Sequence, residues 1–321
     1  MKKFQAVVTT ALCLWLLCGE AYAVENLIPV GQVVGLELRN DRVSVAAFDD
    51  ALGAGAKKAG LQIGDEILDI DGKTVDDAAD IRQALTHSDG QVKLRVLRKD
   101  KEHQLSITPS ITAAGPRLGV YLRQGITGIG TVTWYDPRSG RFGTLGHGVN
   151  QSEGDLAELT QGIVYEANVV SVKRGECGEP GQLRGGVDVD RPIGTLDKNT
   201  PQGVFGQVQK GWTGQTLETM PRTQVKTGAA TIRSTVNGSG PQEYSVEIVK
   251  IYPGNRQEGR NMLLKITDPE LLSATGGIVQ GMSGSPIIQD GKLVGAVTHV
   301  LVNDPTTGYG IFIENMLDAA A

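Results

Sequence analysis

Hydrophobic and polar positions divide the chain into two stretches with different periodicities. In the first stretch, residues 92–97 alternate apolar and polar side chains, as a half-buried strand does. Residues 77–85 repeat their apolar positions every three to four residues, which predicts a short helix. Strand and helix patterns together predict a small α+β module over residues 30–108.

From residue 118 onward, short apolar runs alternate with glycine-rich turns, and only residues 313–320 have the pattern of an amphipathic helix. The chain has 321 residues, enough for about two domains, and 43 of them are glycine. Short strands between such turns are typical of β-barrels. Residues 109–117 contain two prolines and several small residues, which indicates a linker. We therefore predict a mainly β protein with a barrel or pair of barrels at 118–321.

The run at residues 59–75 carries the most specific pattern of the first module. It has a Gly-Leu entry, a Gly-Asp turn, an apolar strand and an Asp-Gly turn, and it resembles the core motif of PDZ domains. PDZ domains bind an extended peptide as an added strand at a sheet edge. We expect the loop Gly35, Leu36, Glu37 and Leu38 to receive the peptide's terminal carboxylate. The alternative is a degenerate PDZ fold that only packs on its neighbour.

The N-terminus has the pattern of an export signal. Two lysines precede an apolar stretch that is too short to span a bilayer, and Ala-Tyr-Ala follows at 21–23. We expect a signal peptide at 1–23 and a mature, exported chain. The alternative is an uncleaved anchor that associates with the membrane. The net charge of -5 gives no support for nucleic-acid binding.

The sharpest chemical signal is the heptapeptide at 280–286, which contains the Gly-x-Ser-Gly-x-Pro pattern around the nucleophile of trypsin-like serine peptidases. Glycines at 281 and 284 allow a tight loop that exposes the hydroxyl of Ser283. The backbone amides of Gly281 and Ser283 would then stabilise an oxyanion. Ser285 is an alternative nucleophile, but it lacks a glycine two positions before it.

A nucleophilic serine needs a base, and the second stretch contains two histidines. His147 lies between Gly146 and Gly148 after an apolar run, which leaves its imidazole accessible. His299 lies inside an apolar strand pattern, which suits a core-facing or edge-strand position better. His147 also precedes Ser283, as the base precedes the nucleophile in chymotrypsin-like enzymes.

A carboxylate should orient the imidazole. Asp268 follows an apolar strand pattern, and Asp197 suits the position equally well by spacing alone. The other candidates between the base and the serine are Asp155, Asp188 and Asp190.

Cys177 is the only cysteine beyond the leader, so the mature chain has no internal disulfide. A cysteine nucleophile is a possible alternative, but Glu176 and Glu179 disfavour a thiolate at this position. No phosphate-binding loop and no His/Cys cluster with metal spacing is present in the sequence. We therefore expect neither a metal nor an organic cofactor.

Several motifs together resemble the SpoIVB peptidase family, the stage IV sporulation protein B of endospore-forming bacteria. They are Leu-Gly-His-Gly at 145–148, Ile-Thr-Asp-Pro-Glu-Leu-Leu at 266–272 and the run from Gly276 to Gln289. This resemblance implies a chymotrypsin-like double β-barrel preceded by a PDZ domain. It also implies the triad His147, Asp268 and Ser283, although trypsin-like enzymes usually carry the acid in the first barrel.

The resemblance further implies a signalling peptidase. Members of the family are exported into the space between the two membranes around the forespore. They cut themselves and then a membrane-bound regulator, SpoIVFA, which leads to processing of a mother-cell sigma factor precursor. The alternative function is a non-catalytic adaptor whose PDZ module binds a peptide tail, but such a scaffold would not need an intact nucleophile loop and an accessible histidine.

Overall fold

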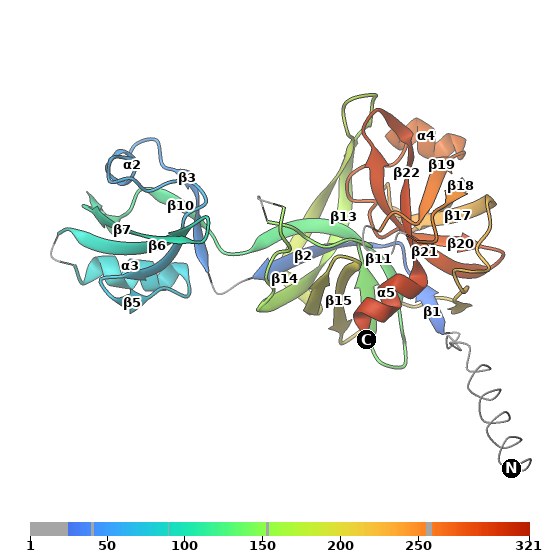
Figure 1. The fold of residues 1–321 in the computed structure, drawn as a ribbon, viewed down its shortest axis with the longest axis horizontal. Helices are drawn as coiled ribbons and strands as arrows, with labels where there is room; N and C mark the ends of the chain where they lie inside the picture. The colour runs from blue at the N-terminus through green and yellow to red at the C-terminus, as the bar shows by residue number, and fades with distance from the viewer. Residues whose placement is uncertain (1–24, 40–41, 89, 152–153, 255–258) are drawn as a thin grey trace, which may run out of the picture.

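The computed structural model describes residues 25–39, 42–88, 90–151, 154–254 and 259–321 and shows two lobes built mainly of strands (Figure 1). The expected signal peptide lies outside the described residues. Each barrel and the PDZ-like module has a separate cluster of buried apolar side chains. The mainly β fold predicted from the sequence, with a PDZ domain and two barrels, is confirmed.

The smaller lobe is the PDZ-like module, a sheet with the strand order β10-β3-β4-β6-β7, in which β5 pairs with β4. Two helices and a separate hairpin, β8–β9, complete it. Its elements are β3 (Val43–Phe48), α2 (Ala54–Lys58), β4 (Glu66–Ile70), β5 (Lys73–Thr74), α3 (Ala78–Thr86), β6 (Val92–Arg98), β7 (Lys101–Ile107), β8 (Ser110–Thr112), β9 (Gly115–Arg117) and β10 (Val120–Arg123).

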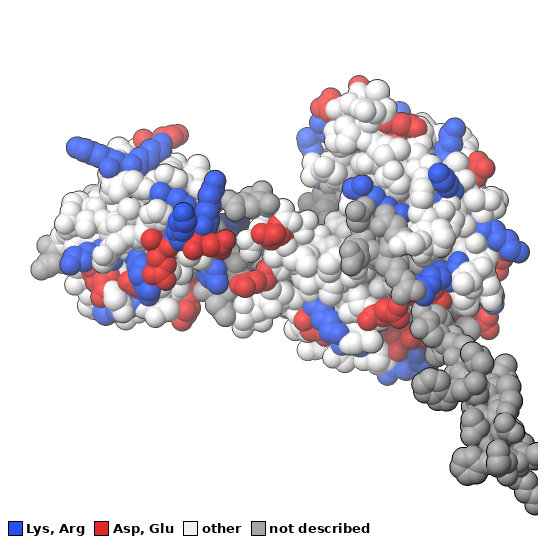
Figure 2. All heavy atoms as spheres, in the orientation of Figure 1, with Lys and Arg blue, Asp and Glu red and all other residues white. Residues whose placement is uncertain are grey.

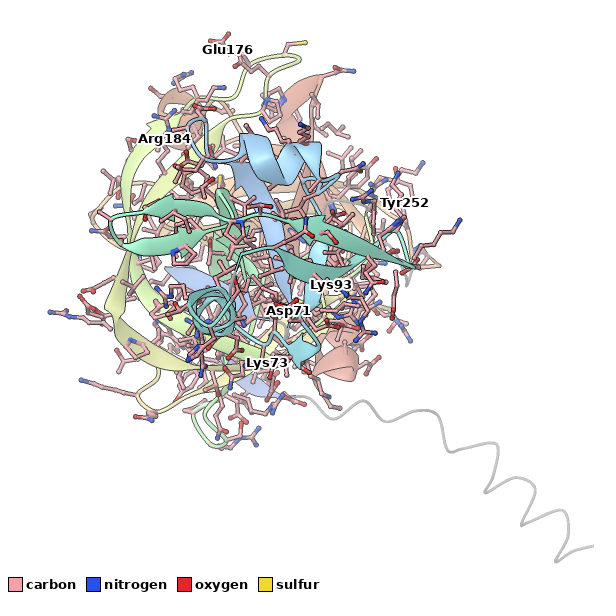
Figure 3. The ribbon with its side chains drawn as sticks, turned by 90° about the vertical axis from the view of Figure 1, so that its left-hand side faces the viewer. Asp71, Lys73, Lys93, Glu176, Arg184 and Tyr252 are labelled. Atoms are coloured by element: carbon pink, nitrogen blue, oxygen red, sulfur yellow. The ribbon has the colours of Figure 1, made fainter. Side chains whose placement is uncertain are left out.

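Local sequence explains two of these elements. Asp71 and Gly72 both have positive φ, 52° and 79°, as a tight hairpin turn requires, and the Asp71 carboxylate accepts from the amide of Lys93 at 2.8 Å. Figure 3, in which the module faces the viewer, labels Asp71 and Lys93. Helix α3 begins where predicted because Asp77 caps it and Asp80 completes a capping box.

The larger lobe contains the two barrels. The first closes through the pairing of β11 with β12 and is extended by β1 and β16. The second is closed in the order β17-β18-β19-β22-β21-β20. The first comprises β1 (Asn26–Pro29), β2 (Val33–Arg39), β11 (Ile126–Tyr135), β12 (Arg141–Thr144), β13 (Gln161–Lys173), β14 (Gln182–Thr200), β15 (Gly203–Val208) and β16 (Leu217–Glu218).

The second barrel carries two helices, and the predicted C-terminal helix is confirmed as α5. Its elements are β17 (Gly228–Ser234), β18 (Gln242–Ile251), β19 (Met262–Ile266), α4 (Pro269–Thr275), β20 (Pro286–Gln289), β21 (Lys292–Leu301), β22 (Asp304–Phe312) and α5 (Ile313–Ala320).

The PDZ-like module is an insertion in the first barrel, which differs from the predicted boundaries. Strand β2 precedes the module but pairs with β11 and β13 of the barrel, whereas β10 at 120–123 pairs with β3 of the module. The expected linker at 109–117 forms the hairpin β8–β9. The chain therefore passes between the lobes twice, after β2 and before β11 (Figure 1).

Candidate active site

Ser283 lies in a tight turn between α4 and β20, with its side chain half-buried. Ser285, the alternative nucleophile, is fully buried, and its Oγ lies 2.7 Å from the carbonyl of Met282 and 3.0 Å from the hydroxyl of Ser234. A hydroxyl that is buried and already bonded cannot meet a substrate. The structure therefore favours Ser283 as the nucleophile.

Three buried threonines of the first barrel hold this loop of the second barrel. The hydroxyl of Thr131 donates to the carbonyl of Gly281 at 2.7 Å, and its amide donates to the carbonyl of Ser283 at 3.1 Å. Thr133 donates to Gly284 at 2.8 Å, and Thr144 donates to the carbonyl of Thr131 at 2.6 Å. The nucleophile loop is thus bonded across the interface between the barrels. Sequence reasoning missed this role.

The amides of Gly281 and Ser283, predicted to stabilise an oxyanion, are free of backbone acceptors in the described part of the chain. The carbonyl of Gln280 accepts from the amide of Leu183 at 2.8 Å, so the trans peptide directs the Gly281 N–H the opposite way. At Gly284, φ is +97° and a Cβ would clash with the carbonyl of Thr131, so only glycine fits there.

His147 follows β12 of the first barrel and is half-buried. Its Nδ1 lies 2.8 Å from the carbonyl oxygen of Gly148. A carbonyl can only accept, so Nδ1 carries the proton and Nε2 keeps a lone pair for a base. Burial lowers the pKa of His147 below 6.5, and the bond to Gly148 opposes this only in part. The ring is therefore neutral at pH 7.

Ser283 and His147 both lie against β21. The Ser283 hydroxyl donates to the carbonyl of Thr298 at 2.7 Å, and the next residue, His299, packs against His147 with the ring centroids 5.2 Å apart. In this conformation the serine proton is directed to Thr298. Transfer of the proton to His147 requires a rotation of the serine side chain, and catalytic hydrogen bonds in free enzymes often form only on substrate binding.

Asp268 has another set of partners. Its Oδ1 accepts from the amides of Glu270 and Leu271, both at 3.0 Å, and caps α4, while Oδ2 accepts from Ser245 at 3.2 Å. Among the described residues, no hydrogen bond or ion pair joins Asp268 to His147.

Strand register explains this separation. Leu263 of β19 pairs with Tyr309, which also pairs with His299 of β21. Asp268 lies five residues farther along from Leu263, which corresponds to about 16 Å at roughly 3.3 Å per strand residue. The structure therefore does not bring the predicted acid to the base.

Two of the other aspartates considered from sequence have partners elsewhere. Asp197 forms an ion pair with Arg141 on the surface, with N–O distances of 3.0 and 3.2 Å. Asp188 pairs with Arg191 at 3.3 Å. The residue that does reach the loop after His147 is Asn199, whose side chain bonds to both backbone groups of Val149. An isolated asparagine near a strand end carries no sequence signal for this role.

The predicted carboxylate-binding loop at Gly35, Leu36, Glu37 and Leu38 is wrong. These residues form the middle of β2, and β11 and β13 pair with them on both sides. Their backbone amides are therefore part of the barrel and cannot receive a peptide terminus. The charge of Glu37 is explained by its neighbours, since it accepts from Arg39 at 2.8 Å and from the hydroxyl of Tyr165 at 2.6 Å.

The groove of the PDZ-like module lies elsewhere, between α3 and β10, the edge strand of its sheet. A cavity of about 400 Å³ is lined there by the apolar side chains of Ile81, Leu85, Leu118 and Val120 and by Arg82 and Arg117. An open strand edge beside a helix is the geometry of strand addition. The sequence feature that could have located this groove is the glycine between two apolar residues at 118–120.

The surface and the thiol add little chemistry. Figure 2 shows basic and acidic side chains interspersed over the face in view.

Cys177 is exposed at the turn after β13, near Glu176, which is labelled in Figure 3. The Sγ of Cys177 lies 3.1 Å from the carbonyl of Asn303. The described residues contain no group of three or more His, Cys, Asp or Glu side chains that could hold a metal ion. No helix within the described ranges is long and apolar enough to cross a membrane.

Two family models match the chain. Residues 115–317 match the family model described as SpoIVB peptidase S55, and residues 53–98 match that of the PDZ domain. No significant match exists among the curated proteins.

Similar solved structures include proteases and a PDZ domain. The PDZ domain of the SdrC-like protein from Listeria monocytogenes is 26% identical, with 26% of this chain and 88% of that chain covered and a TM-score of 0.22. The active form of the Rv3671c protease from M. tuberculosis is 16% identical, with 75% and 84% covered and a TM-score of 0.37. The HtrA-type protease AlgW with a tripeptide is 13% identical, with 60% of this chain and 54% of that chain covered and a TM-score of 0.37.

Proposed function

The chain belongs to the SpoIVB peptidase S55 family and is a serine endopeptidase, and from this premise we propose that Ser283 is its nucleophile and His147 its base. The observation that carries the proposal is their common position against β21, where Ser283 bonds to Thr298 and His147 packs on His299. The two residues come from different barrels, so only the assembled fold creates the site.

The proposed chemistry begins when Nε2 of His147 takes the hydroxyl proton of Ser283 as the oxygen attacks the scissile carbonyl carbon. The amides of Gly281 and Ser283 stabilise the oxyanion of the tetrahedral intermediate. His147 then gives the proton to the leaving amine, and water hydrolyses the acyl-enzyme. The serine returns to its free form at the end of this cycle.

Substrate binding would also prepare the nucleophile. Within the described residues, β20 pairs with β21 only through Lys292–Ala296, so β20 does not cover the carbonyl of Thr298. An extended peptide added at this edge can donate a main-chain N–H to Thr298. The Ser283 hydroxyl would then lose its present acceptor and turn toward His147.

The finer proposal is a role in sporulation signalling, and it rests on the family. The enzyme would cut itself and then the exposed part of a SpoIVFA-like membrane regulator, and so trigger processing of a mother-cell sigma factor precursor. The groove between α3 and β10 supports a separate docking step, because it lies in the inserted module and not beside Ser283. The chain's substrates as a peptidase are proteins.

The proposed location is outside the cytoplasm, in the space between the two membranes around the forespore. The charged, apolar and small-residue regions at 1–23 support export. N-terminal sequencing of the mature protein checks this, with a start near Val24 expected. A chain that still begins at Met1 in the membrane fraction would favour the anchor.

A serine-directed fluorophosphonate and a SpoIVFA-like ectodomain together test the function. We expect the wild type to be labelled and to cut the ectodomain, and Ser283→Ala to do neither. Ser285→Ala is the matched control, since it removes a hydroxyl two residues away and should still be labelled. Labelling of Ser283→Ala at the wild-type rate would reject the assignment.

Labelling and ectodomain cleavage separate the two levels of the proposal. A labelled enzyme that leaves the SpoIVFA-like ectodomain intact would keep the peptidase and reject the regulator as its substrate. Loss of labelling in Ser285→Ala as well, with the fold retained, would show that Ser283 alone does not define the nucleophile.

A further inference from the structure

His299 occupies a position that its apolar sequence context did not suggest. It lies on β21 directly after Thr298, whose carbonyl accepts from the nucleophile, and it is half-buried. Its ring packs against that of His147 with the centroids 5.2 Å apart and the planes tilted by 39°. One strand therefore carries both the acceptor for Ser283 and the contact for the base.

A second observation concerns the Nδ1 atom of His299. This nitrogen is buried, and no described residue provides it with a hydrogen-bond partner. A buried polar atom without a partner costs about 1–3 kcal/mol, so such atoms are rare and frequently mark functional sites. The unpaired nitrogen lies in the ring that contacts the base.

The base needs such a neighbour. When His147 takes the serine proton its ring becomes positive, and in Ser-His-Asp triads a carboxylate stabilises this charge and holds the ring. Here the carboxylate of Asp268 caps α4, and the partner that the described residues provide for Nδ1 of His147 is the neutral carbonyl of Gly148.

We propose that His299 is a positioning residue for His147: its neutral ring fixes the imidazole against β21 and stabilises the positive charge that forms during catalysis. The inference rests on the proposed function of Ser283 and His147. It assigns to a second histidine, with the carbonyl of Gly148, the part that an aspartate plays elsewhere.

The charges around His299 agree with a neutral ring. Burial, His147 and Arg260 together lower the pKa of His299 to about 4. Arg260 itself lies over the ring of Tyr309, at 5.5 Å from its centroid, and Tyr309 pairs with His299 across β21 and β22. At pH 6–8 His299 is therefore uncharged and does not repel a protonated His147.

The kinetic test compares two substitutions. His299→Phe keeps a ring of similar size and removes both nitrogens, whereas His299→Gln keeps polar atoms without the ring. We expect His299→Phe to lower kcat about 10- to 100-fold with KM unchanged, since general-base catalysis is worth about 10²–10⁴-fold in all. His299→Gln should recover part of this loss. His87→Phe, at the exposed C-cap of α3, is the matched control and should match the wild type.

A second readout does not depend on activity. In a Ser283→Ala background, NMR titration of the imidazole nitrogens measures the pKa of His147 directly. His299→Phe, which keeps a ring packed against His147 and so keeps its burial, should lower the pKa of His147, because the imidazolium loses its stabilising neighbour. If His299 only buries His147, the pKa of His147 in His299→Phe should equal that in the parent.

Either measurement can overturn the proposal. Wild-type kcat in a folded His299→Phe variant would do so, as would a rise in KM alone, which would make His299 a wall of the substrate cleft. An unchanged pKa of His147 would have the same consequence. If His299→Phe does not fold, the comparison of His299→Gln with wild type decides. Failure of the proposed function is distinguishable, because the wild type itself would then show no Ser283-dependent hydrolysis.

Discussion

The side chain of Asn199 bonds to both backbone groups of Val149: its Oδ1 accepts from the amide at 2.9 Å and its Nδ2 donates to the carbonyl at 2.8 Å. The same Nδ2 donates to the carbonyl of Ala157 at 2.8 Å. Val149 is two residues after His147, so the end of β14 fixes the loop that carries the base. An amide is needed for this, since it combines one acceptor with two donors.

We expect Asn199→Asp to reduce stability and kcat more than its small change in volume indicates. A carboxylate keeps the acceptor for Val149 but places negative charge against two carbonyl oxygens. Loss of these bonds should destabilise the fold by about 1–3 kcal/mol. It should also lower kcat by loosening His147. Thermal unfolding and steady-state kinetics measure both. Equal activity of Asn199→Asp and wild type would show that this loop does not control the base.

Asp268 offers the opposite comparison. Because asparagine caps helices about as well as aspartate, Asp268→Asn should keep the cap of α4 and nearly all activity, and it should lose only the acceptor for the amide of Ser245. Asp268→Ala should lose about 0.5–2 kcal/mol of stability through the uncapped α4. Paired measurements of unfolding and kcat/KM check this. A loss of about ten-thousand-fold in kcat for Asp268→Asn, as for a triad aspartate, would instead show that Asp268 orients His147.

The inserted module should be removable if the deletion leaves every strand of the first barrel in place. Leu38 pairs with Ile126, so Arg39 and Gly125 mark the ends of a hairpin once the module is gone. We expect replacement of residues 40–124 by Asn-Gly, a favoured two-residue turn, to leave Ser283 reactive toward a fluorophosphonate. Cleavage of the protein substrate should slow, because docking through the groove is lost.

Deletion of residues 30–108 is the matched comparison. It removes β2 from the barrel and should abolish folding. If the variant in which Asn-Gly replaces residues 40–124 cuts the protein substrate at the full rate, a targeting role for the module is excluded. If that variant folds but is not labelled by the fluorophosphonate, the module helps to assemble the catalytic site.

Acid should reduce both activity and stability. Burial lowers the pKa of His147, so the acidic limb of the kcat/KM profile should have its midpoint below pH 6.5. For stability, His299 has a pKa of about 4 in the folded state and about 6.5 when unfolded. Below pH 6.5 His299 binds a proton in the unfolded chain but not in the folded one. The free energy of unfolding therefore decreases as the pH drops from 6.5 to 4. Urea unfolding at pH 7, 5.5 and 4.5 measures it, and His299→Phe should show a weaker dependence.

Local patterns were sufficient for several features. The Asp71-Gly72 turn, the short helix at 77–85 and the tight turn around Ser283 depend on residues adjacent in the chain, so the sequence predicted them. The family motifs likewise predicted a peptidase preceded by a PDZ domain. Such features need no knowledge of which strands pair.

Pairing between distant strands decided the rest. The run at 33–39 has apolar residues at 34, 36 and 38 on one face and charged Glu37 and Arg39 on the other. Its hydrogen bonds to β11 and β13 place it in the first barrel, so the predicted peptide loop was assigned to the wrong domain. The family resemblance implied Asp268 as the triad acid, but the register of β19 with β22 carries it away from the base.

The sequence by itself determined the nucleophile loop, the glycine-flanked histidine and the mainly β class, because each depends on short-range geometry. Only the tertiary structure decided that Thr131 clamps the loop, that Asn199 supports the base and that His299 lies against His147. Threonine, asparagine and histidine are ordinary residues in strands, and their roles arise from partners up to 152 residues away in the chain, as between His147 and His299. Barrel closure alone brings such residues into contact.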